Sequence, residues 1–371
     1  MNIAVTELRR RPGRFVTATI ILTLLATLLM LLGGLLDGLI NGSTGAIAAQ
    51  RGDVIVYSST AQQSFPRSRI TPEELAAVTA VPGVRQVGGL GVVQLGARVP
   101  GNGPRDLADV ALFGYETPPV GVRAAPAAGE AFADRTLEAD GVEVGGTIEL
   151  GPARTPVKVI GWVDDLAYAG QPTLWASAET WRAAVAANRP DAGVGDGVFQ
   201  ALVVTGDAGT DPDALARRID RATDGATDSL SLAAAIEAIP GVEQQRSTFN
   251  QIIGVTVVIA VVVVALFFAL LTVERTGLYG VLKAIGATSG RLFRGVVLQA
   301  LVVTAIASVI GGSIAVALAL VIPPGTIPFT LQPSRVISSV AFLLVAAVIG
   351  CAFSLRRVLA IDPASAIGGS T

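Results

Sequence analysis

The chain has 371 residues, of which 51% are hydrophobic and 15% are charged, and its formal net charge is −2. Charged residues make up about 25% of an ordinary soluble domain, so this composition indicates a protein with much of its surface in lipid. The sequence has no histidine and one cysteine, which argues against histidine-centred catalysis, zinc sites of the Cys/His type and a disulfide framework.

Four long uncharged runs predict membrane-spanning helices, because about 20 apolar residues cross the hydrocarbon core of a bilayer. We place the spans at residues 15–36, 249–273, 295–322 and 336–355. The first run could instead be a secretory signal, since arginines precede it and Ala46-Ile47-Ala48 resembles a cleavage site. The apolar core of a signal is usually about 7–15 residues, so the longer run is expected to remain as a helix.

Lysine and arginine gather next to the spans at three places, which the positive-inside rule assigns to the cytoplasm. These are the amphipathic segment 1–14, the loop 274–294 and the tail 356–371, whereas the loop 323–335 and the region 37–248 are then external. The basic residues are Arg9, Arg10, Arg11, Arg14, Arg275, Lys283, Arg291, Arg294, Arg356 and Arg357. We expect a multi-pass protein of a bacterial plasma membrane with both termini in the cytoplasm.

The external region 37–248 carries a net charge of about −10 and is long enough to bury its own core. Alternation predicts a strand at 52–59, and Thr71-Pro72 predicts the start of a helix. A second helix is predicted at 230–239, and strands at 142–150 and 156–163 indicate a β-rich part. The predicted fold is an α-helical membrane protein with four spans and a mixed α/β external domain, porter-like with a β-rich insert, between spans one and two.

Catalytic signatures are missing from the sequence. Neither Lys158 nor Lys283 follows a glycine, so there is no G-x-x-x-x-G-K-[ST] loop for ATP, and no enzyme activity, catalytic residue or metal site is expected. The pairs Asp164-Asp165 and Asp211 with Asp213 are predicted to be solvated acids or helix caps. The spans contain no ionisable residue, which disfavours an ion-coupled transporter.

Between the second and third spans, periodic apolar residues predict a short basic amphipathic helix. The motif residues are Glu274, Arg275, Gly277, Leu282, Lys283, Ala284, Ile285, Gly286, Ala287 and Thr288. Together with Ile361-Asp362-Pro363-Ala364 near the C-terminus, they resemble the signature of the MacB/FtsX-type permeases of the type VII ABC transporter superfamily.

This resemblance implies a homodimer in membrane lipid, bound to a cytoplasmic ABC ATPase subunit and to no nucleic acid. The ten motif residues would form the coupling helix on the ATPase. ATP and magnesium would bind the ATPase, and this chain would hold no cofactor of its own.

A narrower resemblance, to haem-exporting permeases, lies at Ile239-Pro240-Gly241-Val242-Glu243. It implies haem as a substrate and Glu243 as a ligand to its iron. With no histidine, Met30, Tyr57 and Tyr168 are the other candidate ligands. A structural role explains the presence of these residues equally readily: Glu243 as a cap at the start of a helix, and Met30 as an apolar side chain packed in the core.

Three functions stay open at this point. The first is an export permease for an amphiphile such as haem, a lipid or a drug. The second is a non-transporting FtsX-like mechanotransmitter that regulates an extracellular cell-wall hydrolase. The third is a membrane-anchored sensor without an ATPase.

Overall fold

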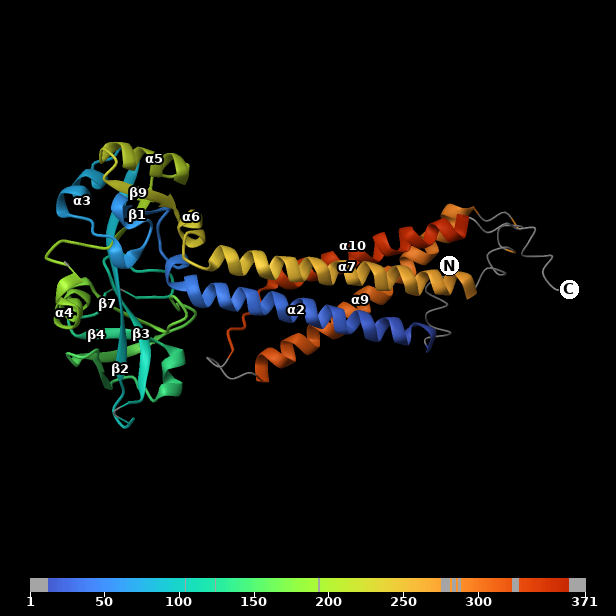
Figure 1. Ribbon diagram of the computed structural model, residues 1–371, viewed down its shortest axis with the longest axis horizontal. Coiled ribbons are helices and arrows are strands. Elements are labelled where there is room, and N and C mark those ends of the chain that lie inside the picture. Colours follow the sequence, from blue (N-terminus) through green and yellow to red (C-terminus); the bar gives the residue numbers. More distant parts are fainter. Residues whose placement is uncertain are drawn as a thin grey trace. The chain divides into compact units, whose positions relative to one another are not determined.

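The computed structural model describes residues 13–103, 105–123, 125–192, 194–274, 281, 285, 288–321 and 327–359 (Figure 1). The chain divides into two compact units. Residues 1–38 and 247–371 form one of them, the helical unit. Residues 39–246 form the other, which corresponds to the predicted external region and is called the external domain below.

Four helices in the described residues are long and apolar enough to cross a membrane. They are α2 (Gly13–Ala48), α7 (Val242–Glu274), α9 (Ser289–Val321) and α10 (Pro333–Leu359). Their number and the large domain between the first two confirm the predicted fold class.

The helices extend beyond the predicted spans. Helix α2 runs twelve residues past the predicted end at 36, α7 begins before 249, and α9 begins before 295. Hydropathy marks only the apolar part of a helix, and polar residues can continue it. In α2, the Ser43 and Thr44 hydroxyls donate to the carbonyls of Leu39 and Ile40 at 3.0 and 2.8 Å, which satisfies these groups within the helix.

Small residues let the helices of the helical unit approach closely. An added Cβ at Gly311 of α9 would lie 2.8 Å from the Cβ of Ala26 in α2. An added Cβ at Gly350 of α10 would lie 2.8 Å from the carbonyl oxygen of Val261 in α7. Without a hydrophobic drive between helices in lipid, such close packing is the main source of their association.

The external domain contains nine strands in the described residues, in the order β3-β7-β4-β6-β5-β2-β8-β1-β9, and β2 also pairs with β3. The additional pairing closes six of the strands into a ring, and β2 continues from this ring into a sheet with β8, β1 and β9. The strands are β1 (Val54–Ser58), β2 (Val84–Arg98), β3 (Leu107–Tyr115), β4 (Glu130–Asp134), β5 (Thr147–Leu150), β6 (Thr155–Val163), β7 (Thr173–Ser177), β8 (Ala201–Gly206) and β9 (Thr227–Ser231).

Helices α3 (Pro72–Thr79) and α5 (Pro212–Ala222) pack on the sheet part of the domain. Helix α3 starts as predicted, because Thr71 and Glu74 form a capping box. The helix predicted at 230–239 is shorter, since β9 takes its first two residues and α6 spans Leu232–Glu237. The strand predicted at 142–150 begins only at Thr147, because Gly145 (φ 92°) turns the chain.

The ring of six strands has an apolar interior into which helix α4 (Ala178–Asn188) inserts a fully buried indole, Trp181. An added Cβ at Gly91 of β2 would lie 2.2 Å from the Trp181 ring, and one at Gly114 of β3 would lie 2.4 Å from the Trp181 Cβ. These two strands therefore carry glycine where the indole lies against their backbones.

Candidate functional site

The predicted coupling segment begins where α7 ends, at Glu274. Thr288 lies directly before α9, and its carbonyl oxygen accepts bonds from the N–H groups of Arg291 and Leu292 at 3.0 and 3.2 Å, as at the start of a helix. Ile285 is 79% exposed. The other motif residues, Arg275, Gly277, Leu282, Lys283, Ala284, Gly286 and Ala287, lie outside the described residues.

The two principal haem-ligand candidates belong to different units. Glu243 is an exposed residue in the first turn of α7, and no described side chain pairs with it. Met30 is 1% exposed within α2, and its sulfur lies 3.4 Å from the point where a Cβ at Gly312 of α9 would stand. Glu243 is thus accessible from solvent, whereas Met30 packs between helices.

The tyrosine candidates lie in the core of the external domain. Phe65 contacts Tyr57 and Tyr168 edge to face, with ring centroids 5.1 and 6.1 Å apart. Burial raises the pKa of Tyr168 to about 12 and raises the pKa of Tyr57 further. Tyr57 and Tyr168 are also only 1% and 9% exposed, so little of either side chain is accessible to a haem iron.

The paired acids have structural roles. Asp164 accepts a hydrogen bond from Arg135 Nε at 2.8 Å, and Asp211 accepts one from the N–H of Ala214 at 3.1 Å as the N-cap of α5. Within the described residues no group of three Asp, Glu, Cys or His side chains is placed to hold a metal ion.

An ion pair that the sequence reasoning missed joins α2 to α10. Arg335 Nη2 and Nε donate to the two carboxylate oxygens of Asp37 at 2.5 and 3.1 Å, and the side chains are 28% and 8% exposed. The sequence holds a signal for it. Asp37 directly follows the first uncharged run and Arg335 directly precedes the last one, at ends that the positive-inside rule places on the same side.

The segment before α10 also contacts the end of α2. The N–H of Thr330 donates to the carbonyl oxygen of Gly34 at 3.0 Å. An added Cβ at Gly38 would lie 2.2 Å from the carbonyl oxygen of Pro328. Together with the ion pair, these contacts hold residues 328–335 against α2.

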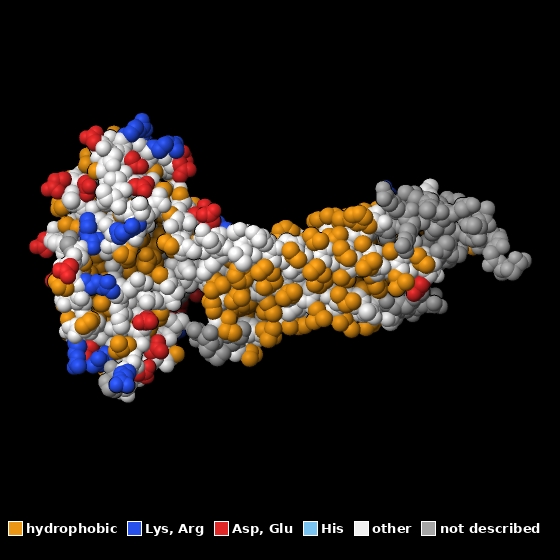
Figure 2. All heavy atoms as spheres, viewed as in Figure 1, with side chains coloured by type: hydrophobic (Ala, Val, Ile, Leu, Met, Phe, Trp, Pro, Cys, Tyr) orange, Lys and Arg blue, Asp and Glu red, His pale blue; other side chains and the backbone are white. Residues whose placement is uncertain are grey.

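The middle of the helical unit packs through small hydroxyls. Thr27 of α2 donates to its own helix at Thr23 (2.9 Å) and to the Gly311 carbonyl of α9 (3.3 Å). On the face shown in Figure 2, the described surface of this unit is mostly apolar, while charged side chains gather on the external domain. Leu24, Leu266 and Val309 are 65%, 67% and 69% exposed, as expected for side chains that face lipid.

Comparison with known proteins identifies the C-terminal part of the chain. Residues 250–363 match the family described as FtsX-like permease C-terminal. A stretch of 136 residues is 30% identical to HrtB of Staphylococcus haemolyticus (strain JCSC1435), named as a hemin transport system permease protein, and covers 37% of this chain and 38% of HrtB. Residues 250–363 therefore form an FtsX-like permease domain, and the chain is called the permease below. Both this relative and the next are named as permeases of transport systems.

A second relative is an uncharacterized ABC transporter permease of Mycobacterium tuberculosis. It is 38% identical to the permease over 115 residues, which cover 30% of this chain and 31% of the relative. The match with each of these two relatives therefore spans less than two fifths of the relative's length.

Two solved structures are similar to part of the permease. The periplasmic region of MacB from Actinobacillus actinomycetemcomitans aligns with a TM-score of 0.36 and 11% identity, over 52% of this chain and 95% of that one. The extracellular domain of the noncanonic ABC-type transporter YknZ aligns with a TM-score of 0.33 and 15% identity, over 48% of this chain and 100% of that one. Scores this low do not establish a shared fold, so the assignment rests on the sequence matches.

Proposed function

We propose that the permease couples ATP hydrolysis by a separate ATPase subunit to movement of its external domain, and that it exports an amphiphilic substrate. The match of residues 250–363 to the FtsX-like permease family carries this proposal, because it includes the whole coupling segment 274–288. In this proposal the permease is a homodimer in a bacterial plasma membrane, with its termini and the coupling segment in the cytoplasm.

Helices α2 and α7 support a mechanical role. Each contains residues of the helical unit and of the external domain, so the chain passes between the units within unbroken helix both times. A helix transmits displacement along its axis because its backbone hydrogen bonds resist stretching. The uncharged spans suit such transmission and offer no relay for ions.

Haem is the substrate we favour, because the relative HrtB is named for hemin transport. Haem is amphiphilic, and a carboxylate near the membrane surface can approach its iron. The exposed Glu243 at the start of α7 is available for this contact, with Met30 as the second candidate.

The coupling role is tested by co-expressing the permease with a candidate ABC ATPase subunit from the same organism and purifying the complex by a tag on the permease. Ile285→Ser is expected to reduce the ATPase recovered at least tenfold, because it removes an exposed apolar side chain of the coupling segment. The matched control is Ile327→Ser, an isoleucine 48% exposed in the connection between α9 and α10. Equal losses in both variants, or none in Ile285→Ser, contradict the proposed coupling segment.

The substrate is tested with the purified complex in lipid nanodiscs. Added haemin is expected to shift its Soret absorbance and to raise ATP turnover, and Glu243→Ala should reduce both effects. Glu179→Ala is the control, since Glu179 is also an exposed acid in the first turn of a helix, α4. If haemin has no effect and an added cell-wall hydrolase raises ATP turnover instead, the permease is a mechanotransmitter and the export proposal fails.

A further inference from the structure

Strand β2 changes partners along one of its edges. Its N-terminal half pairs with β8 as far as Leu90↔Ala201, and pairing on the same edge resumes with β5 at Ala97↔Leu150. Between these pairs, residues 91–96 have β3 on the other edge, but no described strand lies on this one. The chain before β8 leaves β2 because Phe199 bonds instead with Ile70, whose N–H donates to the Phe199 carbonyl at 2.7 Å.

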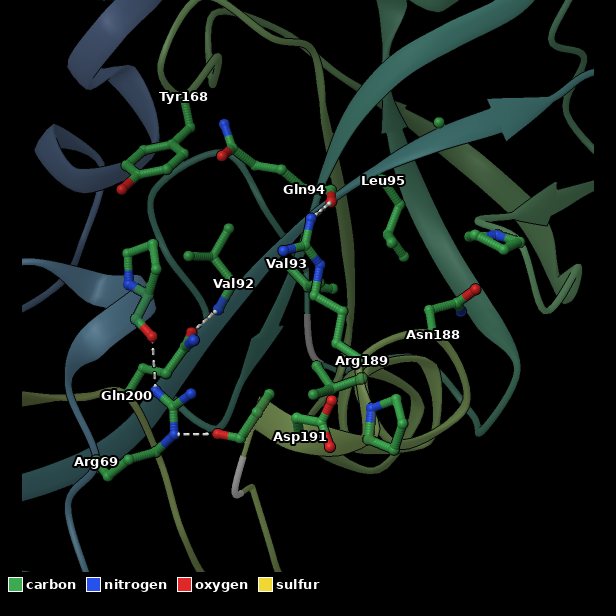
Figure 3. Close-up of a pocket in the computed structure, with 16 residues that line it drawn as sticks. Arg69, Val92, Val93, Gln94, Leu95, Tyr168, Asn188, Arg189, Asp191 and Gln200 are labelled. Atoms are coloured by element: carbon green, nitrogen blue, oxygen red, sulfur yellow. Dashed lines mark hydrogen bonds between the residues drawn. The ribbon is translucent and has the colours of Figure 1, made fainter.

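This open edge lies in a cleft of about 710 Å³ in the external domain (Figure 3). The cleft is also lined by Pro66, Arg69, Val185, Asn188 and Arg189. Residues 92–96 of β2 extend for about 14 Å at roughly 3.4 Å per residue. The volume is within the range of known ligand sites, about 300–1,000 Å³.

The backbone of Gln94 points into the cleft. Along this edge, the carbonyls of Leu90 and Gly96 accept bonds from the N–H groups of Gln200 (3.1 Å) and Gly151 (2.9 Å). Alternate residues of a strand direct their N–H and C=O groups to the same edge, so Gln94 points the same way.

Two side chains make some of the hydrogen bonds that a neighbouring strand would make with this edge of β2. Gln200 Oε1 accepts the Val92 N–H at 2.6 Å, and Arg189 Nη2 donates to the Gln94 carbonyl at 3.3 Å (Figure 3). The second distance is long, so the Arg189 contact is readily replaced. No described group accepts the Gln94 N–H.

The cleft favours a negatively charged ligand. Arg69 is held in place, because its Nε donates to the Ala192 carbonyl at 2.6 Å and its Nη1 to the Pro66 carbonyl at 3.0 Å. Neither Arg69 nor Arg189 has a described carboxylate within ion-pair distance, although Asp191 also lines the cleft. With two guanidinium groups and one carboxylate among its lining residues, the cleft has a net positive charge.

We propose that this cleft binds an extended peptide segment of a partner protein, which adds to β2 as a strand and places an acidic side chain beside Arg189. The peptide exchanges two backbone hydrogen bonds with Gln94, as in strand addition to other open sheet edges. The Gln200 side chain blocks Val92 and so sets where the added strand begins. Apolar side chains of the peptide contact Leu95 and Val185 in the cleft.

The probe is the blocked peptide acetyl-Thr-Val-Glu-Val-Thr-amide, added to the full-length permease in nanodiscs. Hydrogen–deuterium exchange of the segment 90–98 is expected to slow at least fivefold, because the Gln94 N–H gains a partner. The same peptide with N-methyl groups at both valines, which removes two backbone donors, and the peptide with lysine for glutamate are the two controls. Both should bind at least tenfold more weakly.

Two variants test the geometry. Gln94→Pro removes the N–H that faces the cleft and leaves the bonds to β3, which residues 93 and 95 make, so tenfold weaker peptide binding is expected. Arg189→Gln should weaken binding of the glutamate peptide tenfold and bring it level with the lysine peptide. Arg217→Gln, at an exposed arginine of α5, is the charge control and should bind as the parent does.

Equal binding of the parent and N-methylated peptides overturns the proposal, as does an absence of protection by the parent peptide. A further contrary result can come from the permease without peptide. If exchange of the segment 90–98 then slows as the permease concentration rises, a second copy covers the edge and the proposal is overturned. If Gln94→Pro does not fold, the N-methylated peptide and Arg189→Gln decide the question. None of these results depends on the ATPase or on haem, so they are separable from the proposed transport function.

Discussion

At the scale of single residues, the Asp37–Arg335 pair is the charged interaction most sheltered from water among the described ion pairs. Its two parallel hydrogen bonds match the planar guanidinium to the carboxylate. Removing one partner leaves the other charge unpaired in a site with little water. The resulting loss of folding free energy is larger than the net stabilisation that the pair itself contributes.

Asp37→Asn is therefore expected to destabilise the helical unit by about 1–3 kcal/mol, the loss typical of a hydrogen bond to a charged group. The measurement is the midpoint of thermal unfolding in detergent micelles. The control is Glu237→Gln, which breaks the exposed pair Arg246–Glu237, whose side chains are 42% and 64% exposed, and should cost under about 1 kcal/mol. Equal shifts in the two variants would show that the shelter of Asp37 has no effect.

Residue identity alone indicated part of this chemistry. The capping roles of Thr71 and Asp211 are local and could be read from the sequence, since a helix cap involves residues three apart. The Asp37–Arg335 pair joins residues 298 positions apart, and its formation depends on which two helices pack together. The haem-ligand role of Glu243 stays a prediction.

At the scale of elements, α2 contains two glycines one turn apart with different surroundings. An added Cβ at Gly38 would lie 2.2 Å from a backbone oxygen of Pro328, whereas one at Gly42 would meet no atom within 4 Å. Backbone atoms cannot rotate away as a side chain does, so alanine at the first position must displace the connection before α10.

Gly38→Ala is expected to destabilise the permease by about 1–3 kcal/mol through this overlap. Gly42→Ala, its matched control, should be neutral or stabilising by up to about 1 kcal/mol, because alanine favours helix more than glycine does. Thermal unfolding in detergent compares the two. Equal stability of both variants would mean that the Pro328 segment is displaced without cost.

The glycines around Trp181 give a similar test in the external domain. Gly91→Ala is expected to cost about 1–3 kcal/mol, because the methyl group overlaps a fully buried ring. Gly161→Ala, where the added Cβ lies 3.2 Å from the half-buried Phe132 ring, should cost less. Urea unfolding followed by tryptophan fluorescence ranks them. A larger loss in Gly161→Ala would contradict the packing described for α4.

Element types were easier to predict than their pairing. The four apolar helices follow from composition over 20 or more residues, and the strand at 156–163 follows from alternation over eight. The closed ring of strands depends on β5 pairing with β2, about 50 residues earlier in the chain, and no local pattern encodes that contact. The open edge of β2 lies between its pairings with β8 and β5, so no local pattern in the sequence indicates the cleft.

At the scale of the whole molecule, three tyrosines connect the stability of the external domain to pH. Burial raises the pKa of Tyr115 and Tyr168 to about 12 each and raises the pKa of Tyr57 further, while an unfolded phenol titrates near about 10. The folded domain keeps protons that the unfolded chain releases. The corresponding stability is complete below about pH 10 and is lost as the pH rises through 12.

We therefore expect phenol ionisation, followed by absorbance at 295 nm, to coincide with loss of the near-ultraviolet circular dichroism above pH 10. Tyr115→Phe should move the transition to higher pH, since it removes one group that the unfolded state ionises more easily. The substitution also removes the 3.0 Å hydrogen bond from the Tyr115 hydroxyl to the Arg123 carbonyl. The shift in the transition is therefore compared with the change in the free energy of unfolding that the same variant shows at pH 7. Ionisation of these phenols near pH 10 with the dichroism unchanged would contradict the burial described.

The one cysteine of the chain, Cys351, has no exposed surface within α10. A bulky maleimide added from the water phase therefore cannot reach the native thiol while the protein is folded. Cysteines introduced singly at exposed positions such as Ile285 and Ile327 can then be labelled without a signal from the native cysteine. The sidedness of each segment in whole cells becomes measurable without first replacing the native residue.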